Sequence, residues 1–466
     1  MVGRKYWACQ TEVPTFQTHY TAEKVKLRHG VFDVQIAQLF RRGADSRIVS
    51  GLLWITGGQA LVALTGLAGL RILTELAPPS VFGEANLLMS LLTLGMQIIM
   101  APITNTQLRY HSRYDLEGRS DWFTAQILTR SLIAGIAVSA VAVLAIVLWK
   151  YINSLPQRYL LLMAVSVWAP IYVIRNVLLN RASSERKQSL QAIWLCTEAI
   201  MMLIFTALLL LHTKSVEYYL VGQILGVAVS IMAVASMYPA VRRLRLAGAS
   251  KSERLQMSSE IMSYGLPFAP IAVMAWFSSL SDRYMLGTIA GTAAVGQYAA
   301  AFAISSRLSL LVGAIFAAVF RPALFEAENM GDGTRANRLF QYWMAAVAFS
   351  FLAIGIVAIF AARPLSESLL AAEYRPHAVS VILWTILGYA AYSVTQVMEN
   401  RIFSFGTSKK IVFPTFLGGL ANVVFCLYAI PIEGIEGAAK ASAASFFVQL
   451  LSTYLILRDV KLKRRS

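Results

Sequence analysis

The chain has 466 residues, of which 57% are hydrophobic and 14% are charged, and its mean hydropathy is +0.60. Soluble domains usually carry about 25% charged residues, so this composition excludes a soluble globular enzyme. The net charge of +17 would by itself indicate a nucleic-acid-binding protein. The basic residues, however, lie mainly in short segments between apolar runs, so they are interpreted as topology signals and no nucleic acid is expected as a partner.

Twelve apolar runs follow one another along the chain, each long enough to cross a hydrocarbon core of about 30 Å. A segment in lipid must satisfy its own backbone hydrogen bonds, so each run is predicted to be a helix. The fold class predicted is therefore an all-α polytopic membrane protein with twelve transmembrane helices. The runs cover residues 48–74, 81–103, 124–149, 158–179, 190–211, 216–238, 261–289, 293–319, 340–361, 378–398, 411–430 and 434–457.

Residues 1–46 contain no apolar run long enough for a cleavable signal peptide. They are expected to form a cytoplasmic extension, in which 31–40 is either a short amphipathic helix on the membrane surface or part of a disordered tail. The first apolar run then acts as an uncleaved signal-anchor.

Lysine and arginine residues are distributed unevenly among the loops. Thirty of them lie in the two tails and the even-numbered loops, against five in the odd-numbered loops. Basic residues accumulate on the cytoplasmic side of membrane proteins, so both ends of the chain are predicted to be cytoplasmic. The expected location is the bacterial inner membrane.

The two halves of the sequence share a weak internal repeat. Three positions match at an offset of 213 residues, and four polar, proline or aromatic positions match at an offset of 220. The matches are Leu73 with Leu286, Ala77 with Ala290, Gly83 with Gly296, Pro102 with Pro322, Tyr172 with Tyr392, Asn180 with Asn400 and Arg181 with Arg401. An even number of spans in each half predicts two parallel six-helix bundles around a central cavity.

This repeat gives the predicted domain organisation of the chain. A cytoplasmic extension precedes the first bundle, a basic linker separates the two bundles, and a basic cytoplasmic tail follows the second. The corresponding ranges are 1–46, 47–238, 239–258, 259–457 and 458–466.

Three arginines within the predicted spans are the candidate substrate-binding residues. Arg71 and Arg283 come from corresponding stretches of the two halves, and Arg307 lies near the middle of the eighth span. A charge in lipid costs roughly 2.5–3.5 kcal/mol or more, so such residues normally face a cavity or a partner. Together they are predicted to form a cationic wall that binds an anionic substrate, especially a phosphate.

Two acids within the spans, Asp282 and Glu198, are candidates for ion coupling or for ion pairs. Polar residues also share one face on two helices. In span seven these are Glu260, Tyr264, Ser278, Ser281 and Asp282, and in span one Thr56, Gln59 and Arg71. The two stripes indicate either a hydrated cleft between the halves or ordinary hydrogen bonding between helices.

The sequence lacks the motifs of enzymes and of metal sites. It contains no Walker A, HExxH or GxSxG motif in a convincing context. The three cysteines, Cys9, Cys196 and Cys426, have no CxxC spacing. Neither enzymatic activity nor a cofactor nor a bound metal is expected.

Several stretches resemble the polysaccharide-biosynthesis (Wzx-type) flippases of the multidrug/oligosaccharidyl-lipid/polysaccharide exporter superfamily. The stretch from Arg71 to Gly83, RILTELAPPSVFG, is similar to the signature that follows the first helix of that family. Leu266-Pro267, the stretch from Ser281 to Gly287, the stretch from Val295 to Tyr298, and Pro322 resemble its seventh and eighth helices.

The resemblance covers about residues 48–457 and carries functional expectations. It implies that a polyprenyl-diphosphate-linked oligosaccharide, the repeat unit of a surface polysaccharide, moves from the cytoplasmic to the periplasmic leaflet. It also implies alternating access by two six-helix bundles. Membrane lipids, a polysaccharide polymerase and glycosyltransferases are the further partners implied.

Three other functions remain open. The runner-up is a multidrug/cation antiporter of the related multidrug-extrusion group, but the spans carry more base than acid. A peptidoglycan-precursor flippase usually has fourteen spans rather than twelve. A membrane scaffold without transport activity would have no use for the two polar stripes.

Overall fold

The structure is a computed structural model that describes residues 46–152, 159–238, 251–266 and 268–463. The expected helix at 31–40 lies outside these residues. The chain divides into two units, residues 1–49 and 50–466, and everything below concerns the second unit. Its long helices are α2 (Ser46–Leu76), α3 (Pro79–Leu116), α4 (Ser120–Ile152), α5 (Tyr159–Ser184), α6 (Gln188–His212), α7 (Val216–Met237), α10 (Phe268–Asn329), α11 (Gly333–Leu369), α12 (Ala378–Ser404), α13 (Val412–Glu433) and α14 (Ile435–Lys463).

One of these helices, α10, contains two of the predicted spans. Gly291 interrupts it with φ 84° and ψ 169°, a conformation that glycine adopts without the strain that a side chain would cause. Within the described residues, eleven helices are long and apolar enough to cross a membrane, and dividing α10 at Gly291 makes twelve. The prediction of an all-helical membrane protein with twelve spans is confirmed.

Several helices extend beyond the predicted spans at one end of the bundle. α3 has 38 residues, a length of about 57 Å, and it ends at Leu116 instead of 103. Hydropathy marks only the part of a helix in contact with lipid, whereas polar helix-forming residues continue the same helix into water.

We call the end of the bundle at which these helices extend the even-loop end, because the even-numbered loops lie there, and we call the opposite end the odd-loop end. The even-loop end carries the turns at 117–119, 185–187, 330–332 and 405–407, and the odd-loop end those at 77–78, 213–215, 370–377 and 434.

The predicted linker is partly helical. Within 239–258, the described part belongs to α9 (Lys251–Glu260), which leads through the π-helical turn η1 (Ile261–Gly265) into α10. A Cβ atom on Gly265 would lie 2.6 Å from the carbonyl oxygen of Pro102. The start of the second half therefore packs directly against α3 of the first half.

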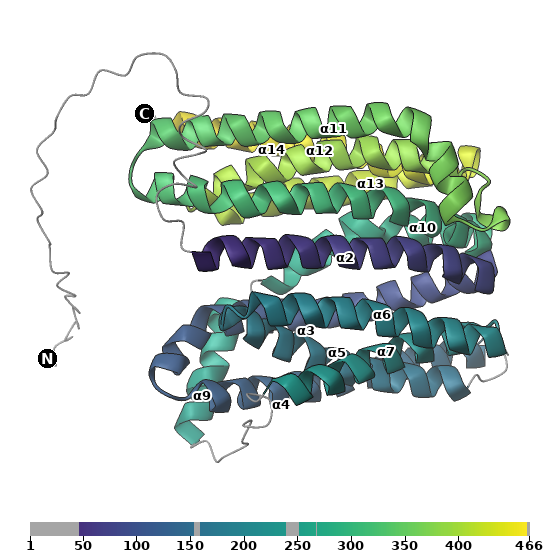
Figure 1. Cartoon of the computed structure of the whole chain (residues 1–466), viewed down its shortest axis with the longest axis horizontal. Helices are drawn as coiled ribbons and strands as arrows, with labels where there is room; N and C mark the ends of the chain where they lie inside the picture. The colour runs from purple at the N-terminus through teal and green to yellow at the C-terminus, as the bar shows by residue number, and fades with distance from the viewer. Residues whose placement is uncertain (1–45, 153–158, 239–250, 267, 464–466) are drawn as a thin grey trace, which may run out of the picture. The chain divides into compact units, whose positions relative to one another are not determined.

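The helices form two groups that follow the two halves of the sequence. In Figure 1, α3 to α7 lie together, as do α11 to α14. Within the first group α6 packs on α7 and α4 on α5, and within the second α14 packs on α12 and α13. The main junction between the groups is α3 against α10, where Trp276 Nε1 donates to the carbonyl of Ser90 at 2.8 Å. The site residues lie around this junction and around α2.

Candidate functional site

Arg71 belongs to a set of contacts that joins α2 to the second half at the odd-loop end. Its guanidinium pairs with Glu75 on the same helix and donates to the carbonyl of Leu370 at 2.6 Å. One turn further on, the N–H of Ala371 donates to Thr74 Oγ1 at 3.1 Å. The short helix η2 (Ala372–Tyr374) follows these residues. Arg71 is thus part of a bridge between the two halves.

Arg307 makes a second bridge between α2 and the second half. Its Nη1 donates to the carbonyl oxygen of Gly66. A Cβ atom on Gly66 would lie 2.9 Å from Arg307 Cζ, so the guanidinium occupies the place of the absent side chain. Gly66 precedes Arg71 by five residues, which is about 7.5 Å along a helix. Arg307 therefore contacts α2 within about two turns of Arg71.

Arg283 of α10 rests against an aromatic ring. Its Cζ lies 5.2 Å from the centre of the Phe302 ring. Its Nε is buried and has no hydrogen-bond partner among the described residues. Among the residues that the structure describes, neither Arg283 nor Arg307 forms an ion pair with a carboxylate. The predicted cationic wall therefore stays a prediction: Arg307 of α10 bonds to Gly66 of α2, the helix that carries Arg71, whereas Arg283 of α10 rests on Phe302.

Asp282 is hydrogen-bonded within the second half. Tyr298 and Ser442 donate their hydroxyls to its Oδ2 at 2.5 and 2.9 Å. The main-chain N–H of Arg283 donates to Oδ1 at 2.8 Å. Asp282 is 2% exposed. A carboxylate this deeply buried needs hydrogen-bond donors, and these three groups supply them.

The polar stripe of span seven makes hydrogen bonds between helices. Ser278 donates to the carbonyl of Thr415 at 3.0 Å, and Asn422 of α13 donates to Ser281 Oγ at 3.2 Å. The sequence left open either a hydrated cleft or ordinary hydrogen bonding between helices, and the contacts of these serines and of Asp282 fit hydrogen bonding between helices. A helical period shows which residues share a face, but not which neighbour that face meets.

Glu198 of α6 forms an ion pair with Arg175 of α5. Arg175 donates from Nη2 to Oε1 at 2.8 Å and from Nε to Oε2 at 2.9 Å. The side chains are 9% and 18% exposed. The paired N–H donors match the two carboxylate oxygens, so the charge of Glu198 is balanced inside the first half.

The even-loop end carries a pair of buried arginines that the repeat predicted to correspond. Arg181, at the end of α5, pairs with Asp121 in the first turn of α4. Arg401, near the end of α12, pairs with Glu328 at 2.8 Å. Both arginines are at most 4% exposed. Each half therefore ties the end of its fourth helix to the segment around its second loop.

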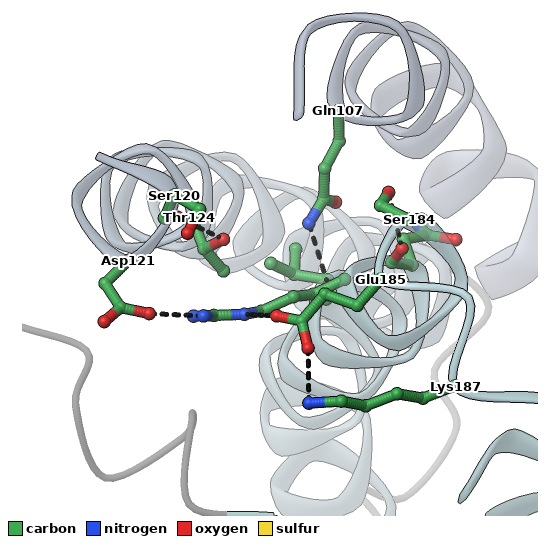
Figure 2. Close-up of polar contacts among 10 residues, drawn as sticks. Gln107, Ser120, Asp121, Thr124, Ser184, Glu185 and Lys187 are labelled. Carbon is green, nitrogen blue, oxygen red and sulfur yellow. Dashed lines mark hydrogen bonds and ion pairs between the residues drawn. The ribbon is translucent and has the colours of Figure 1, made fainter. Parts of the chain in front are cut away.

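Figure 2 shows the ends of the contacts around this position in the first half, with Asp121, Glu185 and Lys187 labelled. Glu185 accepts from Arg181 Nε at 2.7 Å and pairs with Lys187 at 2.6 Å. Burial raises the pKa of Glu185, but the hydrogen bonds from Lys187 and Arg181 outweigh it and lower the pKa to about 2. This carboxylate stays charged throughout the physiological pH range.

Sequence reasoning missed a polar face on α12. It is formed by Thr385, Tyr389, Tyr392, Gln396 and Glu399. Residues spaced by four, three, four and three lie on one side of a helix, so the same test that was applied to spans one and seven would have found them.

The predicted water-filled passage stays a prediction. A cavity of about 460 Å³ lined by Arg375, His377, Trp384 and Glu436 lies elsewhere, at the odd-loop end.

Comparison with known proteins gives the chain a family and a fold. A family model described as polysaccharide biosynthesis protein matches residues 48–328. No curated protein matches the sequence.

Solved structures of transporters share the fold. An inward-facing multidrug resistance MATE family transporter of the MOP superfamily has a TM-score of 0.67 at 14% identity, over 87% of this chain and 96% of that one. The lipid II flippase MurJ, in an inward closed conformation, has a TM-score of 0.69 at 11% identity, over 87% of both chains. A Vibrio cholerae MATE transporter has a TM-score of 0.62 at 14% identity, over 90% and 97%. At these identities the likeness concerns the fold alone.

Proposed function

The chain belongs to the polysaccharide biosynthesis protein family, and on that premise we propose that it is a flippase of the bacterial inner membrane. Its substrate is a polyprenyl-diphosphate-linked oligosaccharide, which it moves from the cytoplasmic to the periplasmic leaflet by alternating access of the two halves. The even-loop end is then cytoplasmic, and the odd-loop end periplasmic.

One observation carries the assignment of the substrate. Arg283 and Arg307 bring two guanidinium groups into the membrane part of the protein, and in the described residues no carboxylate pairs with either. A diphosphate offers the acceptor oxygens that such groups bind most strongly. Arg71, which lies five residues after Gly66 on the helix that Arg307 contacts, is the third residue of this proposed diphosphate site.

The contacts between the halves support a resting state that is closed toward the periplasm. At the odd-loop end, Arg71 and Thr74 of α2 bond to Leu370 and Ala371, and Tyr374 donates to the carbonyl of Ala77 at 2.7 Å. In this state the substrate enters from the cytoplasmic leaflet, and release requires these bonds to break. Asp282 is the proposed coupling residue, because its protonation or ion binding would change the hydrogen bonds between α10 and α14.

The experiment is to measure surface glycan in cells that carry alanine in place of Arg71, Arg283 or Arg307. We expect each variant to reduce export several-fold and the triple variant to abolish it. Lysine at the same positions keeps the charge and should retain partial activity. The matched control is Arg363→Ala, because Arg363 is 82% exposed at the odd-loop end. Full export by the triple variant, with normal protein levels, would remove the proposed site.

A multidrug/cation antiporter is the second candidate, because its fold is the same and because Asp282 and Glu399 place acids within the spans. The pairing of Glu198 with Arg175 argues against it, since that acid is already balanced by a base. Drug resistance upon overexpression, together with unchanged surface glycan after deletion, would favour the antiporter.

A further inference from the structure

One face of α12 carries a polar side chain at every turn of the membrane span. Tyr389, Tyr392, Gln396 and Glu399 follow Thr385 along this face. At 100° per residue, the five positions fall within about 80° of one another. A helix that met only lipid or an apolar core would not keep hydroxyl, amide and carboxyl groups in register over four turns.

This face is oriented away from the lipid-facing side of α12. Leu387 is 44% exposed, and Gln396 is also exposed. The two residues are nine positions apart, which is about two and a half turns, so they lie on opposite sides of the helix. Leucine suits lipid, whereas an amide facing lipid without partners would cost several kcal/mol. The Gln396 side is therefore the one that meets water.

Aromatic rings pack along the polar face and lead to Arg283. The ring centres of Tyr389 and Tyr392 are 5.9 Å apart, and Phe446 of α14 lies 5.1 Å from Tyr392. On the other side, Phe302 lies 5.8 Å from Tyr389. Phe302 is the ring against which the Arg283 guanidinium rests. These ring contacts join the polar face of α12 to a candidate diphosphate-binding residue. Phe302, Tyr389 and Phe446 are buried, so Tyr392 is the partly exposed ring of the group.

The polar atoms on this surface have hydrogen-bonding capacity to spare. Gln396 Nε2 donates to the Tyr392 hydroxyl at 2.6 Å, and Gln449 Nε2 donates to Glu399 Oε1 at 3.4 Å. Each amide has a second N–H, and the carboxylate has a second oxygen. The surface can therefore offer donors and acceptors next to ring faces.

This combination matches the chemistry of a sugar ring. A pyranose has C–H groups that pack on aromatic faces, and hydroxyls that both donate and accept hydrogen bonds. A diphosphate does not fit here, because the Glu399 carboxylate would repel it when charged. We propose that the face of α12 from Tyr389 to Glu399 binds the sugar nearest the diphosphate, while Arg283 binds the diphosphate itself. The proposal rests on the flippase function proposed above.

The test compares two lipid probes bound to the purified full-length protein in nanodiscs. One probe is a C55 polyprenyl diphosphate, and the other is the same lipid carrying a single N-acetylglucosamine. We expect the sugar-bearing lipid to bind about tenfold more tightly. In Tyr392→Ala and Gln396→Ala this preference should fall to about twofold or less, with an unchanged Kd for the bare lipid. Arg283→Ala should weaken the binding of both probes.

The control variant is Leu387→Ala on the opposite side of α12, which should keep the full preference. Tyr392→Phe keeps the ring and removes the hydroxyl, so it should keep part of the preference. Equal affinity of the wild-type protein for both probes would overturn the proposal, as would equal losses for both probes in Tyr392→Ala. Binding of neither probe would overturn the flippase function as well, so the two failures can be told apart.

Discussion

Gly83 of α3 and Gly296 of α10 face each other so closely that neither position has room for a side chain. A Cβ atom on Gly83 would lie 1.9 Å from the carbonyl oxygen of Thr292, and one on Gly296 would lie 2.0 Å from that of Pro79. The same offset of 213 residues relates Pro79 to Thr292 and Gly83 to Gly296. The contact is thus reciprocal, as expected where a rotation axis relates two parallel repeats.

Replacing either glycine with alanine should disfavour the conformation described here. The added methyl group meets main-chain atoms, which cannot move aside as a side-chain end can, so we expect a cost of about 1–3 kcal/mol. The measurement is cross-linking of Thr74→Cys to Ala371→Cys with a short thiol reagent, whose yield should fall several-fold. Gly355→Ala is the control, because a Cβ atom there has no neighbour within 4 Å. An unchanged yield in Gly83→Ala would contradict the prediction.

The proposed orientation can be tested by labelling single cysteines in a cysteine-free background. Glu373 and Met330 are both exposed, at the odd-loop and even-loop ends respectively. In intact spheroplasts, a membrane-impermeant thiol reagent should label Glu373→Cys and leave Met330→Cys unlabelled. Permeabilised cells should label both, which serves as the control for accessibility. The reverse pattern would place both ends of the chain in the periplasm.

Stability at low pH should depend on Glu185. Its pKa is lowered from the ordinary value of 4.5 to about 2, so its stabilising effect is fully present above pH 4.5 and is lost as the pH falls toward 2. The melting temperature of the wild-type protein in detergent should therefore fall between about pH 5 and pH 3. In Glu185→Gln this fall should be smaller by a few °C. Glu326→Gln, at an exposed position of the same end, should behave like wild type.

Asp282→Asn should destabilise the second half even without a substrate. Two hydroxyls and one main-chain N–H point at the carboxylate, and an amide group must turn its own N–H groups toward one of these donors. Such a mismatch costs about 1–3 kcal/mol, which should lower the melting temperature by a few °C. Ser166→Ala, an exposed serine on α5 that bonds within its own helix, is the control. Equal melting temperatures of Asp282→Asn and wild type would show that the cluster is not structural.

Hydropathy and charge were sufficient to predict the number of spans, because lipid imposes length and backbone satisfaction on every spanning segment. They could not locate helix ends, since α3 continues to Leu116 through polar residues that form a helix equally well in water. They placed the break between spans seven and eight at 290–292, but they could not show that α10 continues on both sides of it up to the single non-helical residue Gly291.

The site was predicted less completely than the fold. Arg71 and Arg307 were singled out as substrate-binding residues, which stays a prediction. Arg71 pairs with Glu75, but both arginines also donate to main-chain carbonyls, which leave no signature in a sequence. Asp282 was expected to take part in ion coupling or in an ion pair. Ion coupling stays a prediction, and the hydroxyls of Tyr298 and Ser442 that bond to this carboxylate were not foreseen. The direction in which a helix face points depends on tertiary packing, which periodicity does not encode.

The main-chain acceptors of the two arginines have an evolutionary consequence. A carbonyl oxygen is present whatever the residue type, so position 370 can drift among apolar residues while Arg71 keeps its bond. Position 66 has no such freedom, because any side chain there would displace the guanidinium of Arg307. In related sequences, substitutions at 66 should therefore occur together with loss of the arginine at 307, whereas those at 370 should occur independently of position 71.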